Sequence, residues 1–116
     1  MAEIFEPVNE LTEALAARDV ERAIRLYAAD AEVVRYEGVA KGTDEIRAFL
    51  IGFLSGYERF ELISIDQVQR SDDMVVYDSS NETGAGVLQT INVLQLDNDG
   101  LITRHVPLIR GYWGKT

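Results

Sequence analysis

The 116-residue sequence contains no cysteine, a single histidine and two prolines. Without cysteine the chain cannot form disulfides, use a thiolate as a nucleophile or bind a metal through sulfur. His105 alone cannot make a histidine-rich metal cluster. A carboxylate site for magnesium or calcium is chemically open, but no D-x-D-x-D-G run supports one. The sequence therefore predicts no metal site.

Basic residues are in the minority as well, with 11 Lys and Arg against 20 Asp and Glu and a formal net charge of −9. Such a charge repels phosphate backbones and anionic membranes, so we expect neither nucleic acid nor a membrane as a partner. No apolar run approaches the roughly 20 residues that span a bilayer. Residues 1–7 lack the basic and apolar regions of a signal peptide, and we expect a cytoplasmic protein.

Apolar residues at helical spacing predict a first helix over about residues 6–17. Asp19 suits the N-cap of a short second helix. The apolar residues of that helix are Val20, Ala23, Ile24 and Tyr27. The third predicted helix is the clearest, with Gly42-Thr43 as its cap, acidic residues in its first turn and Gly56 as its end.

Strand patterns dominate the second half of the sequence. Residues 31–37 suit a short strand and residues 38–42 a loop, whereas after Tyr57 the apolar period changes from 3.6 to 2. Four strands are predicted there, at residues 59–70, 74–81, 86–97 and 101–112. Short polar turns join them, as between antiparallel neighbours. Helices first and strands later indicate one α+β domain over residues 1–116, not alternating α/β.

Both faces of the last two predicted strands are partly apolar. One face carries Leu88, Thr90, Asn92, Leu94 and Leu96, and in the last strand Leu101, Thr103, His105, Pro107 and Ile109. The other carries Val87, Gln89, Ile91, Val93 and Gln95, and in the last strand Ile102, Arg104, Val106, Leu108 and Arg110. A sheet covered by helices on one side only should be polar on the other. We therefore expect a second copy of the chain to cover the outer face in a homodimer.

Asn92 and His105 share their predicted face with leucines. A polar group in such surroundings must be hydrogen-bonded or lie beside a cavity that holds water or a ligand. Two interpretations are therefore open. The two residues are either a satisfied core amide and a satisfied core histidine, or part of a site.

Three stretches of the sequence resemble the nuclear transport factor 2-like superfamily, in particular its ketosteroid isomerase and SnoaL-like polyketide cyclase branch. They are ALAARDVERAIRLYAADAEV at Ala14–Val33, KGTDEIRAFL at Lys41–Leu50 and INVLQLDNDGLITRH at Ile91–His105. The resemblance implies a cystatin-like cone, in which three helices lie across a strongly curved antiparallel sheet and enclose a pocket. It also implies dimerisation through the outer sheet face. The chemistry it implies is cofactor-free acid–base catalysis on hydrophobic rings, although other relatives only bind or scaffold.

Matching the isomerase site onto this sequence residue by residue gives a mixed result. The carboxylate base falls on Arg35, which stays protonated. Glu37, two residues later, is either a displaced base or an exposed loop carboxylate. The tyrosine donor falls near Leu11, which has no hydroxyl, and the protonated aspartic acid falls on Asn92, whose amide can donate the same hydrogen bond. The Asp–Arg–Asp arrangement of the epoxide hydrolase branch cannot be assembled.

Three functions remain open. In the first, the protein is a cofactor-free enzyme that isomerises, cyclises or dehydrates a hydrophobic ring, with His105 as general acid or base and Asn92 holding an oxyanion. Arg35 and Tyr77 would then orient the substrate, and Ser79 would also point inward. In the second, a hydrophobic ligand is bound unchanged in a pocket lined by Phe49, Phe53, Tyr57, Leu94 and Trp113. In the third, the aromatic residues form the filled core of a dimerising module.

Overall fold

The computed structural model of the chain describes residues 2–114, with side chains from residue 6 onwards. Its helices are α1 (Ala2–Ala16), α2 (Val20–Ile24) and α3 (Gly42–Ser55). Its strands are β1 (Tyr27–Arg35), β2 (Gly38–Lys41), β3 (Glu61–Arg70), β4 (Met74–Glu82), β5 (Gly86–Leu96) and β6 (Ile102–Gly114). The predicted α+β class is confirmed.

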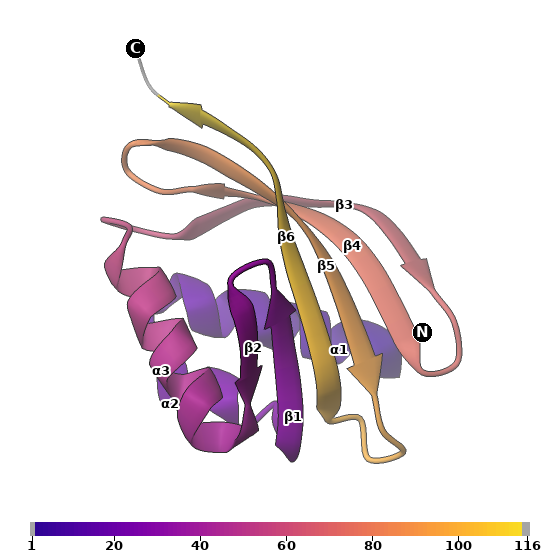
Figure 1. Cartoon of the computed structure of the whole chain (residues 1–116). Coiled ribbons are helices and arrows are strands. Elements are labelled where there is room, and N and C mark those ends of the chain that lie inside the picture. The colour runs from indigo at the N-terminus through magenta and orange to yellow at the C-terminus, as the bar shows by residue number, and fades with distance from the viewer. Residues whose placement is uncertain (1, 115–116) are drawn as a thin grey trace.

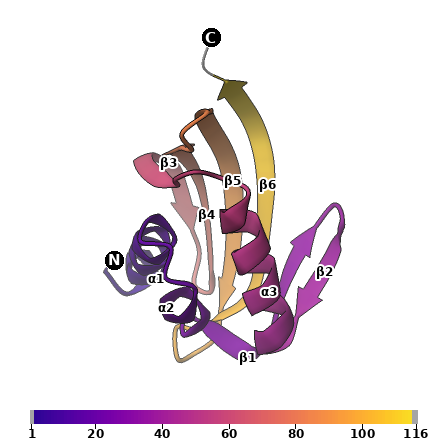
Figure 2. The same ribbon diagram turned by 90° about the vertical axis from the view of Figure 1, so that its left-hand side faces the viewer.

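A single sheet with the strand order β2-β1-β6-β5-β4-β3 curves over the three helices, which lie on its concave side (Figures 1 and 2). Neighbouring strands are antiparallel, with one exception, because β1 runs parallel to β6. This parallel pair places Val33 opposite His105. Residues from the first third of the chain therefore share a wall with the last strand.

The sequence predicted a loop over residues 38–42, but the chain forms β2 there. Tyr36 and Glu37 make a two-residue turn, and β2 then runs back antiparallel to β1. Along β2, Val39 is exposed while Ala40 is buried in the core. With four residues, this strand is too short for its alternation to be recognised in the sequence. Pairing with β1 and burial of Ala40 stabilise it.

β1 starts earlier than predicted. It begins at Tyr27, not at residue 31, so Tyr27 belongs to the sheet and not to the second helix. The partner of Tyr27 in the parallel register is Ile102, at the other end of the sequence. A long-range pairing of this kind overrides local helical spacing.

Polar contacts fix both ends of α3. The prediction of a Gly42-Thr43 cap was wrong, because the N-cap is Lys41 and its side chain makes no capping bond. Instead the Glu45 carboxylate accepts a hydrogen bond from the backbone N–H of Lys41 at 2.8 Å, which is one half of a capping box. Gly56 is confirmed as the C-cap. There the Arg18 guanidinium, reaching over from the end of α1, donates to a carbonyl in the last turn of α3.

Two β-bulges bend β6. Thr103 and Arg110 each lie between two consecutive register pairs with β5 and have no register partner of their own in that strand. Bulges bend a strand and shift its inward and outward alternation. Ile102, which the sequence placed on the outer face, therefore turns inward and is fully buried.

The main core lies between the concave face of the sheet and the helices. Its fully buried side chains include Val8 and Leu11 of α1, Ile46 of α3, and Val33, Val75, Leu94 and Ile102 of the sheet. On the convex face, Ile91, Val93, Val106 and Leu108 are half-buried, beside an ion pair of 2.6 Å between Arg110 and Asp78. The outer face is thus apolar in its middle and charged beside it.

Replacing Ile102 by alanine tests the shifted alternation of β6. We expect Ile102→Ala to lower the free energy of unfolding by about 2–5 kcal/mol, because it empties a fully buried position. Ile63→Ala is the matched control, since Ile63 is 56% exposed, and it should cost less than about 1 kcal/mol. Urea denaturation of both variants makes the comparison. Equal losses would mean that Ile102 points outward.

Candidate functional site

A partly open cavity of about 160 Å³ lies between the helices and the concave face of the sheet. One wall is apolar and comprises Leu11, Leu15, Phe49, Leu50, Phe53 and Phe60. The opposite wall comes from β4, β5 and β6 and comprises Tyr77, Ser79, Asn81, Thr90, Asn92 and His105, with Thr12 of α1 nearby. Arg35, Tyr36, Glu37, Pro107, Leu108 and Ile109 complete the lining. The cavity therefore has an aromatic side and a polar side.

The aromatic side is a packed group of rings. Phe53 lies edge-on to Phe60, with ring centroids 5.2 Å apart, and is 6.0 Å from Phe49. Tyr57 packs edge-on against Phe53 at 5.3 Å, behind the lining. Tilted and edge-to-face rings hold one another in place. Phe53 thus presents a fixed apolar surface to the cavity.

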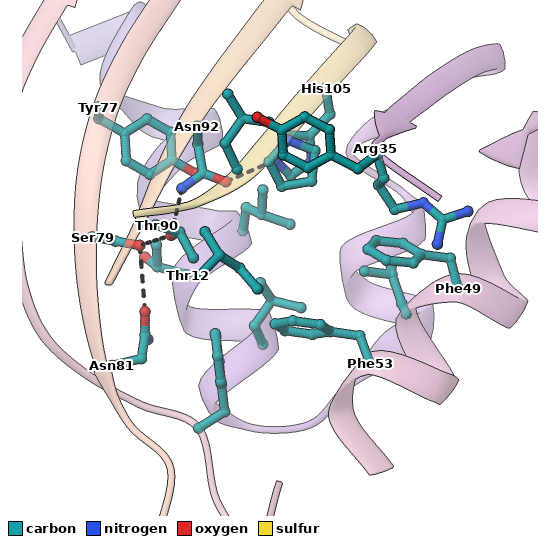
Figure 3. A pocket seen from close by; sticks show the side chains of 18 of the residues that line it. Thr12, Arg35, Phe49, Phe53, Tyr77, Ser79, Asn81, Thr90, Asn92 and His105 are labelled. Atoms are coloured by element: carbon teal, nitrogen blue, oxygen red, sulfur yellow. Dashed lines mark hydrogen bonds between the residues drawn. The ribbon is translucent and has the colours of Figure 1, made fainter. Parts of the chain in front are cut away.

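On the polar side, His105 is held between two strands (Figure 3). Its Nδ1 lies 2.9 Å from the hydroxyl of Tyr27 on β1, and its Nε2 lies 2.9 Å from the side-chain oxygen of Asn92 on β5. The amide nitrogen of Asn92 donates to Thr90 at 2.9 Å. The Asn92 oxygen can therefore only accept from His105, so Nε2 carries the proton and Nδ1 accepts from Tyr27.

The hydrogen bonds keep the same donor-to-acceptor direction along the rest of the polar wall. Thr90 accepts from Asn92, so its own hydroxyl is free to donate to Ser79, 2.9 Å away. Ser79 in turn donates to the side-chain oxygen of Asn81 at 3.3 Å. We call the six residues Tyr27, His105, Asn92, Thr90, Ser79 and Asn81 the polar chain. Every bond in it points from Tyr27 towards Asn81.

Burial keeps His105 neutral. The side chain is 5% exposed, and desolvation lowers the pKa of His105 from 6.5 to about 4. Burial also raises the pKa of Tyr27 and of Tyr77 well above 10, so both hydroxyls stay protonated. At neutral pH the polar wall carries no charge, and both nitrogens of His105 are engaged in hydrogen bonds.

Two polar groups of the lining remain uncommitted. The hydroxyl of Tyr77 makes no hydrogen bond to any residue of the described part of the chain, although its ring is almost fully buried. Arg35 is half-buried, and its Nε is a buried donor without a hydrogen-bond partner among the described side chains. The guanidinium carbon of Arg35 lies 4.5 Å from the centroid of the Phe49 ring, which is a cation–π contact.

The structure brings eight of the predicted site residues to the cavity. They are His105, Asn92, Arg35, Glu37, Tyr77, Ser79, Phe49 and Phe53. Of these, Glu37 lies exposed in the turn after β1, so β1 does not extend to it as a regular strand would. His105 and Asn92 are hydrogen-bonded to each other, and a cavity lies beside them. The filled core without a pocket is therefore not what this arrangement supports.

Three predicted pocket residues lie elsewhere. Leu94 is on the predicted face, but the helices cover that part of β5 and bury it completely in the core. Tyr57 backs the ring of Phe53 without reaching the lining. Trp113 is 57% exposed near the end of β6, and that end of the strand extends beyond the helices (Figure 1). These three expectations about the pocket lining are corrected.

Sequence reasoning missed several members of the site. Tyr27 was assigned to a helix, and no local pattern reveals its hydrogen bond to a residue 78 positions later. Thr90 was placed on the same face as Asn92 but given no role, although two hydrogen-bonding residues two positions apart on one strand face were a usable signal. Thr12 and Asn81 also line the cavity.

Across residues 2–114, no helix is long and apolar enough to cross a membrane. In the same part of the chain, no group of three or more histidine and acidic side chains is placed to hold a metal ion.

Solved structures of other proteins have the same fold. A SnoaL-like protein from Burkholderia thailandensis superposes with a TM-score of 0.82 at 15% identity, over 96% of this chain and 98% of that one. TerC, co-crystallized with polyporic acid, gives 0.79 at 18% identity, over 92% and 91%. A cystatin fold protein from Novosphingobium aromaticivorans gives 0.76 at 18% identity, over 93% and 98%. The predicted cystatin-like architecture is confirmed.

Sequence comparison gives the family. No curated protein matches the chain. The model of the SnoaL-like domain matches residues 8–105, which include α2, α3, both walls of the cavity and most of the polar chain's strands. The chain belongs to the SnoaL-like domain family.

Proposed function

We propose that the protein binds a small ring-shaped organic molecule in this cavity. The observation that carries the proposal is the pairing of an aromatic wall with a polar wall around about 160 Å³. An engineered apolar cavity of about 150 Å³ binds benzene, so this one has room for about one enclosed ring. Because the cavity is partly open, a larger ligand would extend through the opening. TerC, which shares the fold, was co-crystallized with an organic acid, polyporic acid.

Binding without conversion is the function that the geometry supports best. A general base needs a free lone pair within reach of the substrate. His105 has none, because Nδ1 accepts from Tyr27 and Nε2 carries a proton that it donates to Asn92. The one acidic residue among the described lining residues is Glu37, which lies exposed in a turn. The site thus offers donors and apolar surface to a ligand.

Weakening the aromatic wall tests this proposal. We expect 2-naphthol to bind and to shift the backbone amide signals of Thr90 and Asn92 in ¹H–¹⁵N spectra. Phe53→Ala should weaken this binding by at least about tenfold, which corresponds to the loss of about 1.4 kcal/mol of ring contact. Ile51→Ala is the control, because Ile51 lies on the same helix as Phe53 but is 52% exposed and does not line the cavity, and it should bind within about twofold of the parent.

The spectra of both variants also show whether each remains folded. If 2-naphthol shifts signals elsewhere on the molecule, or if Phe53→Ala binds it as well as Ile51→Ala does, the ligand site is not this cavity.

The neutral state of His105 makes a prediction about pH. Its pKa is about 4 in the folded chain and near 6.5 in the unfolded chain, so the unfolded state binds more protons between these values. Stability is therefore complete above pH 6.5 and decreases as the pH falls towards 4. From pH 7 to pH 5 we expect the free energy of unfolding to fall by about 2 kcal/mol through this group.

Urea denaturation of the parent and of His105→Gln at several pH values measures this contribution. His105 is the chain's one histidine, so the difference between the two slopes from pH 7 to pH 5 isolates it from the carboxylates, which titrate mostly lower. Parallel slopes would show that His105 titrates normally and is free to act as a base.

Acid–base conversion of a ring substrate is the second candidate function. The observation in its favour is that His105 and Asn92 stand together in the cavity wall with the Tyr27 hydroxyl directly behind them. His105 would move a proton after exchanging one of its partners, and Asn92 would hold a developing oxyanion. Glu37 from the turn is the other carboxylate within the lining, and Arg35 and Tyr77 would orient the substrate.

Isomerisation of 3-cyclohexen-1-one to its conjugated isomer, followed by ultraviolet absorbance, tests this candidate. If the site is catalytic, Asn92→Ala should lower kcat by at least about a hundredfold, as the loss of an oxyanion donor does. Gln95→Ala is the control, since this amide lies on the outer face of the same strand. A parent rate equal to that of buffer, or an Asn92→Ala rate equal to the parent's, would remove catalysis of this type.

Homodimerisation and a cytoplasmic location stay predictions. In support of the dimer, Ile91, Val93, Val106 and Leu108 form a half-buried apolar strip on the convex face of the sheet. Of these four residues, Leu108 also lines the cavity, whereas Ile91, Val93 and Val106 do not.

A further inference from the structure

Arg35 is placed where a ligand of this cavity must meet it. It is the last residue of β1, it lines the cavity, and its guanidinium carbon lies 4.5 Å from the centroid of Phe49. In Figure 3, Arg35 and Phe49 lie on one side of the cavity, and Tyr77, Ser79 and Asn81 lie on the other. The ring beneath the guanidinium limits its movement, so the positive charge is held at one end of the cavity.

This charge has no counter-ion within the described part of the chain. Acidic residues outnumber basic ones by 20 to 11, and most of the arginines form ion pairs with acidic side chains. Ion pairs with carboxylates are formed by Arg22, Arg47, Arg59, Arg104 and Arg110. Arg35 forms none with any residue from 6 to 114, and its buried Nε has no acceptor there. A half-buried cation left unpaired in an acidic protein needs an explanation.

Glu37, the one acidic residue in the described lining, does not act as the counter-ion of Arg35. Glu37 is two residues away and also lines the cavity, but it lies exposed in the turn and forms no ion pair with Arg35. The other lining residues carry no negative charge at neutral pH, because the polar wall is made of hydroxyls, amides and a neutral imidazole. No residue from 6 to 114 therefore supplies an anion to Arg35, whereas an anionic ligand would.

We propose that Arg35 binds the anionic group of the ligand, and that the ligands of this cavity are ring-containing organic acids ionised at neutral pH. This inference rests on the proposed function, since it names the chemical class of the molecule bound there. A carboxylate accepts hydrogen bonds from a guanidinium in a bidentate fork, and such charge-assisted bonds are about twice as strong as neutral ones. A ligand carboxylate at this place would give the buried Nε of Arg35 a hydrogen-bond acceptor.

The two ends of the cavity fix the orientation of such a ligand. The anionic group lies at Arg35, the ring packs against Phe53, and the far edge of the ring faces Tyr77 and Ser79. The Tyr77 hydroxyl, which has no partner in the described part of the chain, donates to a carbonyl or hydroxyl oxygen on that far edge.

A matched pair of probes tests the inference. 2-Naphthoate and 2-naphthamide have nearly the same shape, but only the first is an anion at pH 7.5. By calorimetric titration we expect the parent protein to bind 2-naphthoate at least about tenfold more tightly than 2-naphthamide. In Arg35→Gln this preference should disappear, while the affinity for 2-naphthamide stays within about threefold of the parent's.

Two further variants keep the result interpretable. Arg35→Lys retains the charge without the planar fork and should keep a reduced preference, which also covers the case in which Arg35→Gln does not fold. Arg25→Gln removes an exposed arginine outside the lining and should keep the full preference. Equal binding of both probes by the parent, or an unchanged preference in Arg35→Gln, would overturn the role of Arg35 while leaving the proposed function standing. If neither probe binds, both proposals fall.

Discussion

The buried imidazole of His105 imposes the constraint from which the rest of the site follows. Burial makes the charged form costly, so the ring is neutral, and a neutral ring must donate through one nitrogen and accept through the other. Tyr27 on β1 and Asn92 on β5 meet these two needs from opposite sides of β6. The three strands in the middle of the sheet are therefore joined through side chains as well as through the backbone, and the polar wall is neutral and rigid.

The polar wall is neutral, and both nitrogens of its one histidine are hydrogen-bonded. The resemblance to the ketosteroid isomerases implies a carboxylate base at the position that falls on Arg35 in this sequence, where the side chain is instead a cation. The Arg35 cation, the protonated tyrosines and the engaged nitrogens of His105 are the observations that support our proposal of binding without conversion.

The sequence allowed part of this to be predicted. Strand alternation needs only near neighbours, so it correctly placed Asn92 and His105 on one inward face and the convex strip on the other. It failed wherever distant pairing decides the outcome. Tyr27 joins the sheet through a strand 75 or more residues later, and bulges in β6 turn Ile102 inward, which no regular period reveals. Trp113 looked like a pocket residue because nothing in the sequence says where the helices cease to cover the sheet.

The one-way order of the polar chain has a consequence for how the pocket responds to what it holds. Between Tyr27, which only donates, and Asn81, which only accepts, each member of the polar chain accepts from one neighbour and donates to the next. An inner member therefore cannot reverse alone without two donors or two acceptors facing each other. Reversal would have to be collective, with both asparagine amides flipped and the imidazole proton moved to the other nitrogen. The polar chain thus has two stable directions of hydrogen bonding and no stable intermediate. The ¹⁵N chemical shifts of the His105 ring would show which nitrogen carries the proton, and so which direction the chain adopts.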